Sequence, residues 1–122
     1  MMSVSMFANE PSKVMLHAGD YLFRDGDNPD FLYILLYGQA GVWVGKREVE
    51  VFGPGEMIGE MALIESAPRT ASVQAKMECE FARIDAKRFM FLITETPGFA
   101  LSVMRTMAAR LRSANRLIES LD

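Results

Sequence analysis

One short stretch of the sequence combines a glycine, a carboxylate and an arginine at a spacing that could bind a small anion. Gly59 and Glu60 open this stretch, and Arg69 follows nine residues after Glu60. Glu60 to Leu63 can form one helical turn, which we expect Pro68 to end. The first turn of a helix carries backbone N–H groups without partners, which suit an anion. Arginine adds a planar, two-pronged donor that matches a phosphate group.

The carboxylate and the local charge narrow the ligand class. An ionised Glu60 only accepts hydrogen bonds, so it could bind hydroxyl groups. A site that binds an anion next to a group that binds hydroxyls is what a ribose phosphate needs. Between residues 55 and 73 there are three acidic side chains, and Arg69 is the one basic side chain. A polyphosphate would meet net repulsion there, and the sequence has no P-loop lysine pattern. These features favour a phosphodiester with one negative charge over ATP.

Composition excludes several other classes. The chain has 122 residues, half of them hydrophobic, which is enough for one domain with its own core over residues 1–122. It has a single histidine, His17, and a single cysteine, Cys79, so neither a multi-histidine metal centre nor an internal disulfide can form. We therefore expect no metal and no catalytic cofactor. The same single histidine argues against a metal-dependent cupin enzyme.

Charge and hydropathy bear on partners and location. The formal net charge of −3 argues against direct nucleic-acid binding, which needs a basic excess. No apolar run approaches the roughly 18 residues of a membrane helix. The N-terminus lacks the basic start and apolar stretch of a signal peptide. A cytoplasmic location without membrane contact is expected.

The elements that must position the candidate site fall into two parts. Residues 13–84 contain short apolar runs separated by glycine-containing turns, at 21–24, 31–37, 41–44, 48–52, 70–75 and 80–84, with residues 45–47 as a hairpin loop. This pattern predicts an antiparallel β-roll, a jelly-roll barrel or double-stranded β-helix.

Residues 85–122 predict helices. Asp85 can cap a helix over 87–93, and residues 96–98 break it. From Phe99 onward neither glycine nor proline occurs, which predicts a long C-terminal helix. Its basic face, which includes Arg110, is interpreted as solvated. An apolar row on this helix predicts a homodimer seam; its members are Met104, Met107, Leu111, Ala114, Ile118 and Leu121.

The stretch around Glu60 also resembles a known family. The run from Gly59 to Leu63, followed by Pro-Arg-Thr-Ala-Ser-Val at 68–73, looks like the phosphate-binding cassette of cyclic nucleotide-binding domains, with that family's spacing between Glu60 and Arg69. The resemblance extends over roughly residues 14–121, through the turns at 19–20 and 25–27 and the glycine at position 38. The C-terminal helix is similar to that of the bacterial catabolite-activator branch.

The resemblance implies roles for individual residues. Arg69 would bind the cyclic phosphate, Glu60 would accept from the ribose 2′-hydroxyl, and Gly59 would allow close approach. Backbone N–H groups near Ala62 and Ala71 would complete the phosphate cradle. Three further candidates are Thr70, beside the phosphate and within reach of the purine edge, Asn115 on the helix over the base, and Met61, which flanks the cassette. No catalytic residue is implied.

The sequence therefore predicts a regulatory sensor, not an enzyme, that binds a 3′,5′-cyclic nucleotide and signals through its C-terminal helix. The resemblance favours cAMP, with cGMP as the alternative ligand. Because no helix-turn-helix, kinase or channel sequence follows the helix, we expect a stand-alone sensor or a module of a larger protein. Three other interpretations stay open: a barrel that dimerises but binds another effector or none, the sensor half of a DNA-binding transcription regulator, and a simple Glu60–Arg69 surface ion pair.

Overall fold

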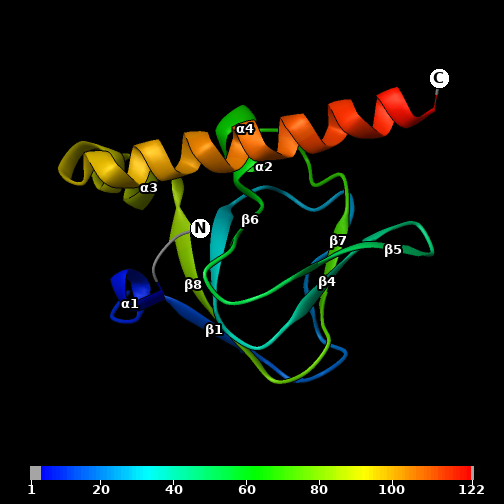
Figure 1. The fold of residues 1–122 in the computed structure, drawn as a ribbon. Helices are drawn as coiled ribbons and strands as arrows, with labels where there is room; N and C mark the ends of the chain where they lie inside the picture. Colours follow the sequence, from blue (N-terminus) through cyan, green and yellow to red (C-terminus); the bar gives the residue numbers. More distant parts are fainter. Residues whose placement is uncertain (1–3, 122) are drawn as a thin grey trace.

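The structure, a computed structural model, describes residues 4–121 and consists of a β-roll with helices at its N-terminal and C-terminal ends (Figure 1). Two four-stranded sheets make up the roll, with the strand orders β1-β8-β3-β6 and β2-β7-β4-β5, and every pairing is antiparallel. The strands are β1 (Lys13–Leu16), β2 (Tyr21–Phe23), β3 (Phe31–Tyr37), β4 (Ala40–Val44), β5 (Arg47–Phe52), β6 (Met57–Ile58), β7 (Ser72–Ala75) and β8 (Cys79–Asp85). The predicted fold class is confirmed.

Four helices accompany the roll: α1 (Val4–Phe7), α2 (Glu60–Glu65), α3 (Ala86–Glu95) and α4 (Pro97–Ser120). The predicted start of α3 is confirmed, because the Asp85 carboxylate accepts from the backbone N–H of Arg88 at 2.7 Å. No loop separates α3 from α4 at Pro97. It stands in the first turn of α4, where its missing N–H costs no helical hydrogen bond.

Three short elements, α1, β1 and β6, were not among the runs predicted from the sequence. The end of α2 also differs from the prediction. The helix stops before Pro68, at Ser66, which adopts a left-handed conformation with φ of 55°. The backbone N–H of Ala67 then bonds to the carbonyl of Ala62 at 3.1 Å and satisfies one of the last carbonyls of the helix.

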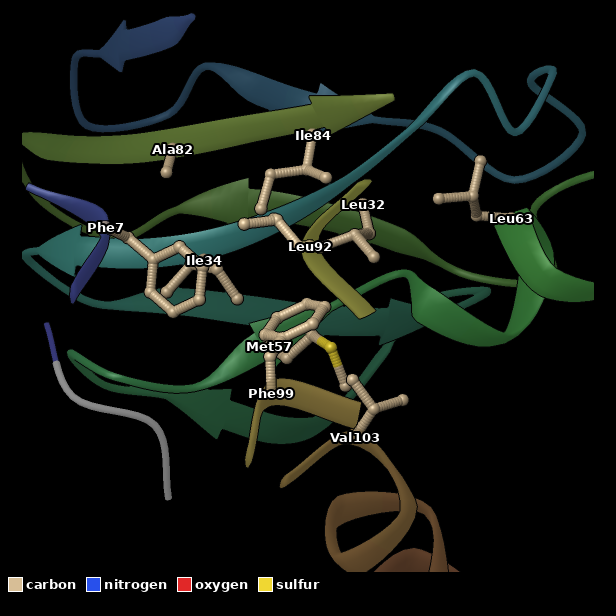
Figure 2. Close-up of a cluster of buried hydrophobic side chains, with 10 residues drawn as sticks. All are labelled: Phe7, Leu32, Ile34, Met57, Leu63, Ala82, Ile84, Leu92, Phe99 and Val103. Atoms are coloured by element: carbon tan, nitrogen blue, oxygen red, sulfur yellow. The ribbon is translucent and has the colours of Figure 1, made fainter. Parts of the chain in front are cut away.

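Two apolar clusters hold the sheets and helices in place. One lies inside the roll and includes Leu35, Val73 and Phe81. The other joins the outer side of β3 and β8 to the helices and is drawn in Figure 2. In it, Phe99 and Val103 from the start of α4 pack beside Met57 of β6. Because these side chains are almost fully buried, the first two turns of α4 are fixed against the roll.

The second half of α4 has a different environment. Every residue from 111 to 120 is exposed, whereas Met107 still packs against the buried cluster. Of the predicted apolar row, Met104, Leu111, Ile118 and Leu121 are each at least 60% exposed. The helix runs along the roll (Figure 1). Its apolar row is largely uncovered in the single chain.

Candidate functional site

Arg69 is a buried arginine held by backbone carbonyls. Its side chain is only 3% exposed, and its terminal nitrogens donate to the carbonyl oxygens of Gly59, at 2.8 Å, and Phe31. The guanidinium carbon lies 4.1 Å from the centre of the Phe23 ring. The third nitrogen, Nε, is buried and has no hydrogen-bond partner. The guanidinium is therefore fixed in position while one of its nitrogens is still without a partner.

Gly59 allows this placement of Arg69. Its φ of +80° is a conformation that other residues rarely adopt. A Cβ atom at this position would lie 2.4 Å from a terminal nitrogen of Arg69. In the structure, it is the Arg69 side chain that approaches Gly59 closely, and the close approach of a ligand at Gly59 stays a prediction.

The charge of Arg69 has no direct counterpart. Within residues 4–121, no carboxylate lies within ion-pair distance of its guanidinium. Burial lowers the pKa of Arg69, and the charges of Asp30 and Asp27 oppose that effect. A buried cation without a paired anion is unfavourable. An incoming anion would supply both the missing charge and an acceptor for Nε.

Glu60 is the second buried charge. It opens α2, and its side chain is completely buried. One oxygen, Oε1, accepts from Nη1 of Arg110 on α4, while the other, Oε2, is buried without a partner. Arg110 also donates from Nη2 to the Met57 carbonyl at 2.5 Å, and its guanidinium carbon lies 5.4 Å from the centre of the Phe52 ring. The site thus holds an unused acceptor on Glu60 as well as an unused donor on Arg69.

These contacts correct two interpretations of the sequence. Glu60 and Arg69 do not form a simple surface ion pair, because both are buried and each has different partners. Arg110 does not belong to a solvated basic face, because it binds the Glu60 carboxylate. Sequence reasoning missed Arg110. A signal was available, since a carboxylate expected inside a roll needs a cation, and the basic residues of the long helix were candidates.

A cavity of about 790 Å³ lies between β5, the segment that leads into β6, and α4. This volume is in the range of small-ligand sites. Its lining residues are Val49, Glu50, Phe52, Gly55, Glu56, Met57, Arg105, Thr106, Ala109, Arg110, Ser113, Ala114 and Leu117. Arg110 connects the cavity to the cassette, because it lines the cavity and also binds Glu60. Burial lowers the pKa of Arg110, and the carboxylates of Glu50 and Glu56 oppose this.

None of the other candidate residues lines this cavity. Ala62 and Ala71 are half-buried at either end of the cassette, whereas Met61 and Thr70 are exposed. Asn115 is exposed on α4 and does not line the cavity, although its neighbour Ala114 does. The structure therefore brings Gly59, Glu60 and Arg69 together, and the assignment of all these residues as ligand contacts stays a prediction.

Between residues 4 and 121, no helix is both long enough and apolar enough to cross a membrane.

Comparisons with known proteins show the family of this chain. The family model described as "Cyclic nucleotide-binding domain" matches residues 13–96, which include all of the cassette. The human "Patatin-like phospholipase domain-containing protein 6" is 32% identical over 109 residues, which are 82% of this chain and 8% of that protein. The "CRP-like cAMP-activated global transcriptional regulator" of Mycobacterium tuberculosis is 28% identical over 110 residues, 84% of this chain and 48% of the regulator.

Among solved structures, the catabolite activator protein of Thermus thermophilus is similar with a TM-score of 0.85 and 27% identity. The similarity covers 97% of this chain and 58% of that one. The chain thus spans less than two thirds of the length of each of these proteins. Since the family model matches well over half of the residues, the chain belongs to the cyclic nucleotide-binding domain family.

Proposed function

We propose that this chain is a regulatory sensor module that binds a 3′,5′-cyclic nucleotide through its Glu60–Arg69 cassette and has no catalytic activity of its own. The observation that carries the proposal is the pair of buried polar atoms without partners, Nε of Arg69 and Oε2 of Glu60. Buried polar atoms are normally paired, so an unused donor and an unused acceptor in one site call for a ligand that supplies the complements. A cyclic phosphate offers the acceptor, and a ribose hydroxyl offers the donor.

Charge supports a ligand with a single negative charge. Arg69 provides one buried positive charge without a paired carboxylate, whereas the charge of Arg110 is already matched by Glu60. A phosphodiester would neutralise Arg69, while a polyphosphate would add charges for which the cassette has no further cation. The backbone N–H groups near Ala62 and Ala71 remain the proposed additional donors. The resemblance to the catabolite-activator branch favours cAMP over cGMP as the ligand.

The output is proposed to run through α4. The helix is tied to the cassette by the Arg110–Glu60 pair, and its residues form one wall of the cavity. A hydroxyl group that binds Oε2 would change the surroundings of this pair, so ligand binding would favour one position of the helix over others. The uncovered apolar row of α4 fits a homodimer seam, and we propose that ligand binding assists the pairing of two copies.

A second candidate function is the sensor part of a DNA-binding transcription regulator. The observation that favours it is the match to the mycobacterial regulator, in which this type of domain makes up about half of the protein. The enzyme functions named for other relatives have no such support, since the chain corresponds to only 8% of the phospholipase.

Isothermal titration calorimetry tests the proposal. The purified chain is titrated with cAMP, cGMP and 5′-AMP, the last as a control with the same base and sugar but an open, more highly charged phosphate. We expect saturable binding of at least one cyclic nucleotide and much weaker binding of 5′-AMP. Equal affinity for cAMP and 5′-AMP, or the absence of binding by either cyclic nucleotide, would contradict the proposal.

A further inference from the structure

One carboxylate in the cavity wall, that of Glu50, takes part in none of the hydrogen bonds or ion pairs described so far. Glu50 and Glu56 both line the cavity, but they differ in their partners. The Glu56 carboxylate accepts from the backbone N–H of Gly53 at 2.7 Å, so one of its oxygens is committed to the turn before β6. For the Glu50 carboxylate, no side-chain hydrogen bond or ion pair is found within residues 4–121, and its interaction with the described residues is its charge, which opposes the lowering of the Arg110 pKa by burial. Its two oxygens are free to accept from a ligand in the cavity.

The surroundings of Glu50 suit a flat, partly apolar group. Val49 and Phe52 stand beside it on β5, and across the cavity α4 presents the small side chains of Ala109, Ser113 and Ala114. Small residues leave space between the strand and the helix. Aromatic and aliphatic surfaces around a few fixed polar groups are typical of sites that bind planar ligands. The cavity also adjoins Arg110, and through it the Glu60 carboxylate, so a ribose held at Glu60 would direct its base toward this space.

The chemistry of a carboxylate discriminates between the two purines. Ionised glutamate only accepts hydrogen bonds. Guanine presents two adjacent donors on one edge, N1–H and the 2-amino group, which match the two carboxylate oxygens. Adenine presents one amino donor next to a ring nitrogen that is itself an acceptor, and that nitrogen would face a carboxylate oxygen unfavourably. Adenine is instead matched by an amide side chain, which accepts and donates at once.

We propose that Glu50 reads the base of the bound cyclic nucleotide and gives this site a preference for guanine over adenine. The inference rests on the proposed function. It assigns base specificity to a residue of β5 in place of Thr70. Thr70 directly follows Arg69 in the sequence, is exposed and does not line the cavity. It also reverses the preference for cAMP that the sequence resemblance alone favours.

The test is the ratio of the cGMP and cAMP affinities, measured by calorimetry for the wild type and for Glu50→Gln. We expect the wild type to bind cGMP more tightly. The substitution keeps the size of the side chain but turns one acceptor into a donor. It should therefore weaken the binding of cGMP and strengthen the binding of cAMP. Charge-assisted hydrogen bonds of this kind correspond to a shift of the ratio by about 10- to 100-fold. Glu50→Ala should weaken the binding of cGMP without strengthening the binding of cAMP.

Glu48→Gln is the matched control. Glu48 lies on the same strand and carries the same charge, but it pairs with Lys76 and does not line the cavity, so its substitution should leave the ratio within about twofold. Glu50 is exposed, so its variants should fold like the wild type. A ratio that Glu50→Gln leaves unchanged, or tighter wild-type binding of cAMP, overturns the inference alone. If neither nucleotide binds the wild type, the proposed function is overturned, and this inference with it.

Discussion

Arg110 on α4 donates a hydrogen bond to the Glu60 carboxylate at the start of α2, fifty residues earlier in the chain. The pair is asymmetric, because the Glu60 side chain is completely buried while that of Arg110 is 30% exposed. The two residues connect the candidate ligand site to the long helix without any intervening side chain. This contact gives the proposed sensor a direct mechanical link between its cassette and its output element.

Removal of Arg110 should destabilise the protein by leaving a buried carboxylate without a cation. For Arg110→Met we expect a loss of about 3–5 kcal/mol in the free energy of unfolding, as for other broken buried pairs. Glu60→Gln in the same background should recover part of that loss, because an uncharged amide costs less to bury. Urea denaturation of the two single variants and the double variant measures this coupling. Additive effects would show that the two residues are not energetically coupled.

Substitution of Arg69 should reduce nucleotide affinity more than any other change in the cassette. Arg69→Ala removes the one buried guanidinium that the cassette offers to a phosphate, which corresponds to a loss of about 2–5 kcal/mol, or roughly 30- to several-thousand-fold in affinity. Arg69→Lys should recover only part of this, since lysine restores the charge but not the planar fork.

The Arg69 variants need a control for folding, because Arg69 also donates to the carbonyls of Gly59 and Phe31. Circular dichroism and thermal melting of both variants provide it, and affinities are compared below their melting temperatures. A folded Arg69→Ala protein with wild-type affinity for cyclic nucleotides would contradict the assignment of the site.

The distal half of α4 should act both as a lid and as a dimer seam. Truncation after Arg110 keeps the pair with Glu60 but removes Ser113, Ala114 and Leu117 from the cavity wall. We expect weaker nucleotide binding and a monomer with or without ligand. The full chain should shift toward a dimer when ligand is added, because a short apolar row alone is a marginal coiled coil.

A charged substitution separates the two roles of α4. Ile118 is 60% exposed and lies outside the cavity lining, so Ile118→Glu should block dimer formation without opening the cavity. Sedimentation velocity with and without nucleotide reports the oligomeric state. Wild-type affinity in the truncated protein, together with a monomeric full chain at saturating ligand, would show that this segment is neither lid nor seam.

The single histidine provides a pH-dependent probe of the roll. Nδ1 of His17 lies 2.5 Å from Oε1 of Glu78, and the pKa of His17 is raised, first by this hydrogen bond and then by the charges of Glu78 and Asp20. A raised pKa in the folded state means that the protonated form is favoured. Any stabilisation is therefore complete below the ordinary histidine pKa and is lost as the pH rises through the folded-state value.

NMR titration of the imidazole signals measures this directly, since the chain has one histidine. The titration midpoint should lie above the ordinary value, and Glu78→Gln should lower it. The effect on stability should be small because the pair is exposed to solvent. A midpoint that Glu78→Gln leaves unchanged would show that the pair does not persist in solution.

The sequence alone determined the features that depend on neighbouring residues. The start of α3 at Asp85, the hairpin between β4 and β5 and the short helix after Gly59 all follow from turn and capping residues close to the elements that they shape. The fixed spacing of Glu60 and Arg69 likewise identified the cassette, because both side chains belong to one local strand–helix–strand segment. The position of Arg69 as the one basic side chain among three acidic ones between residues 55 and 73 was also visible in the sequence.

The tertiary structure decided the features that depend on residues far apart in the chain. Only the packing of α4 through Phe99 and Val103 brings Arg110 to Glu60, and no local pattern distinguishes Arg110 from the solvated arginines near it. The same packing places Glu50 of β5 across a cavity from α4. Burial then determines which charges matter, because it removes water as the alternative partner of Arg69 and Glu60, and burial is set by the whole fold.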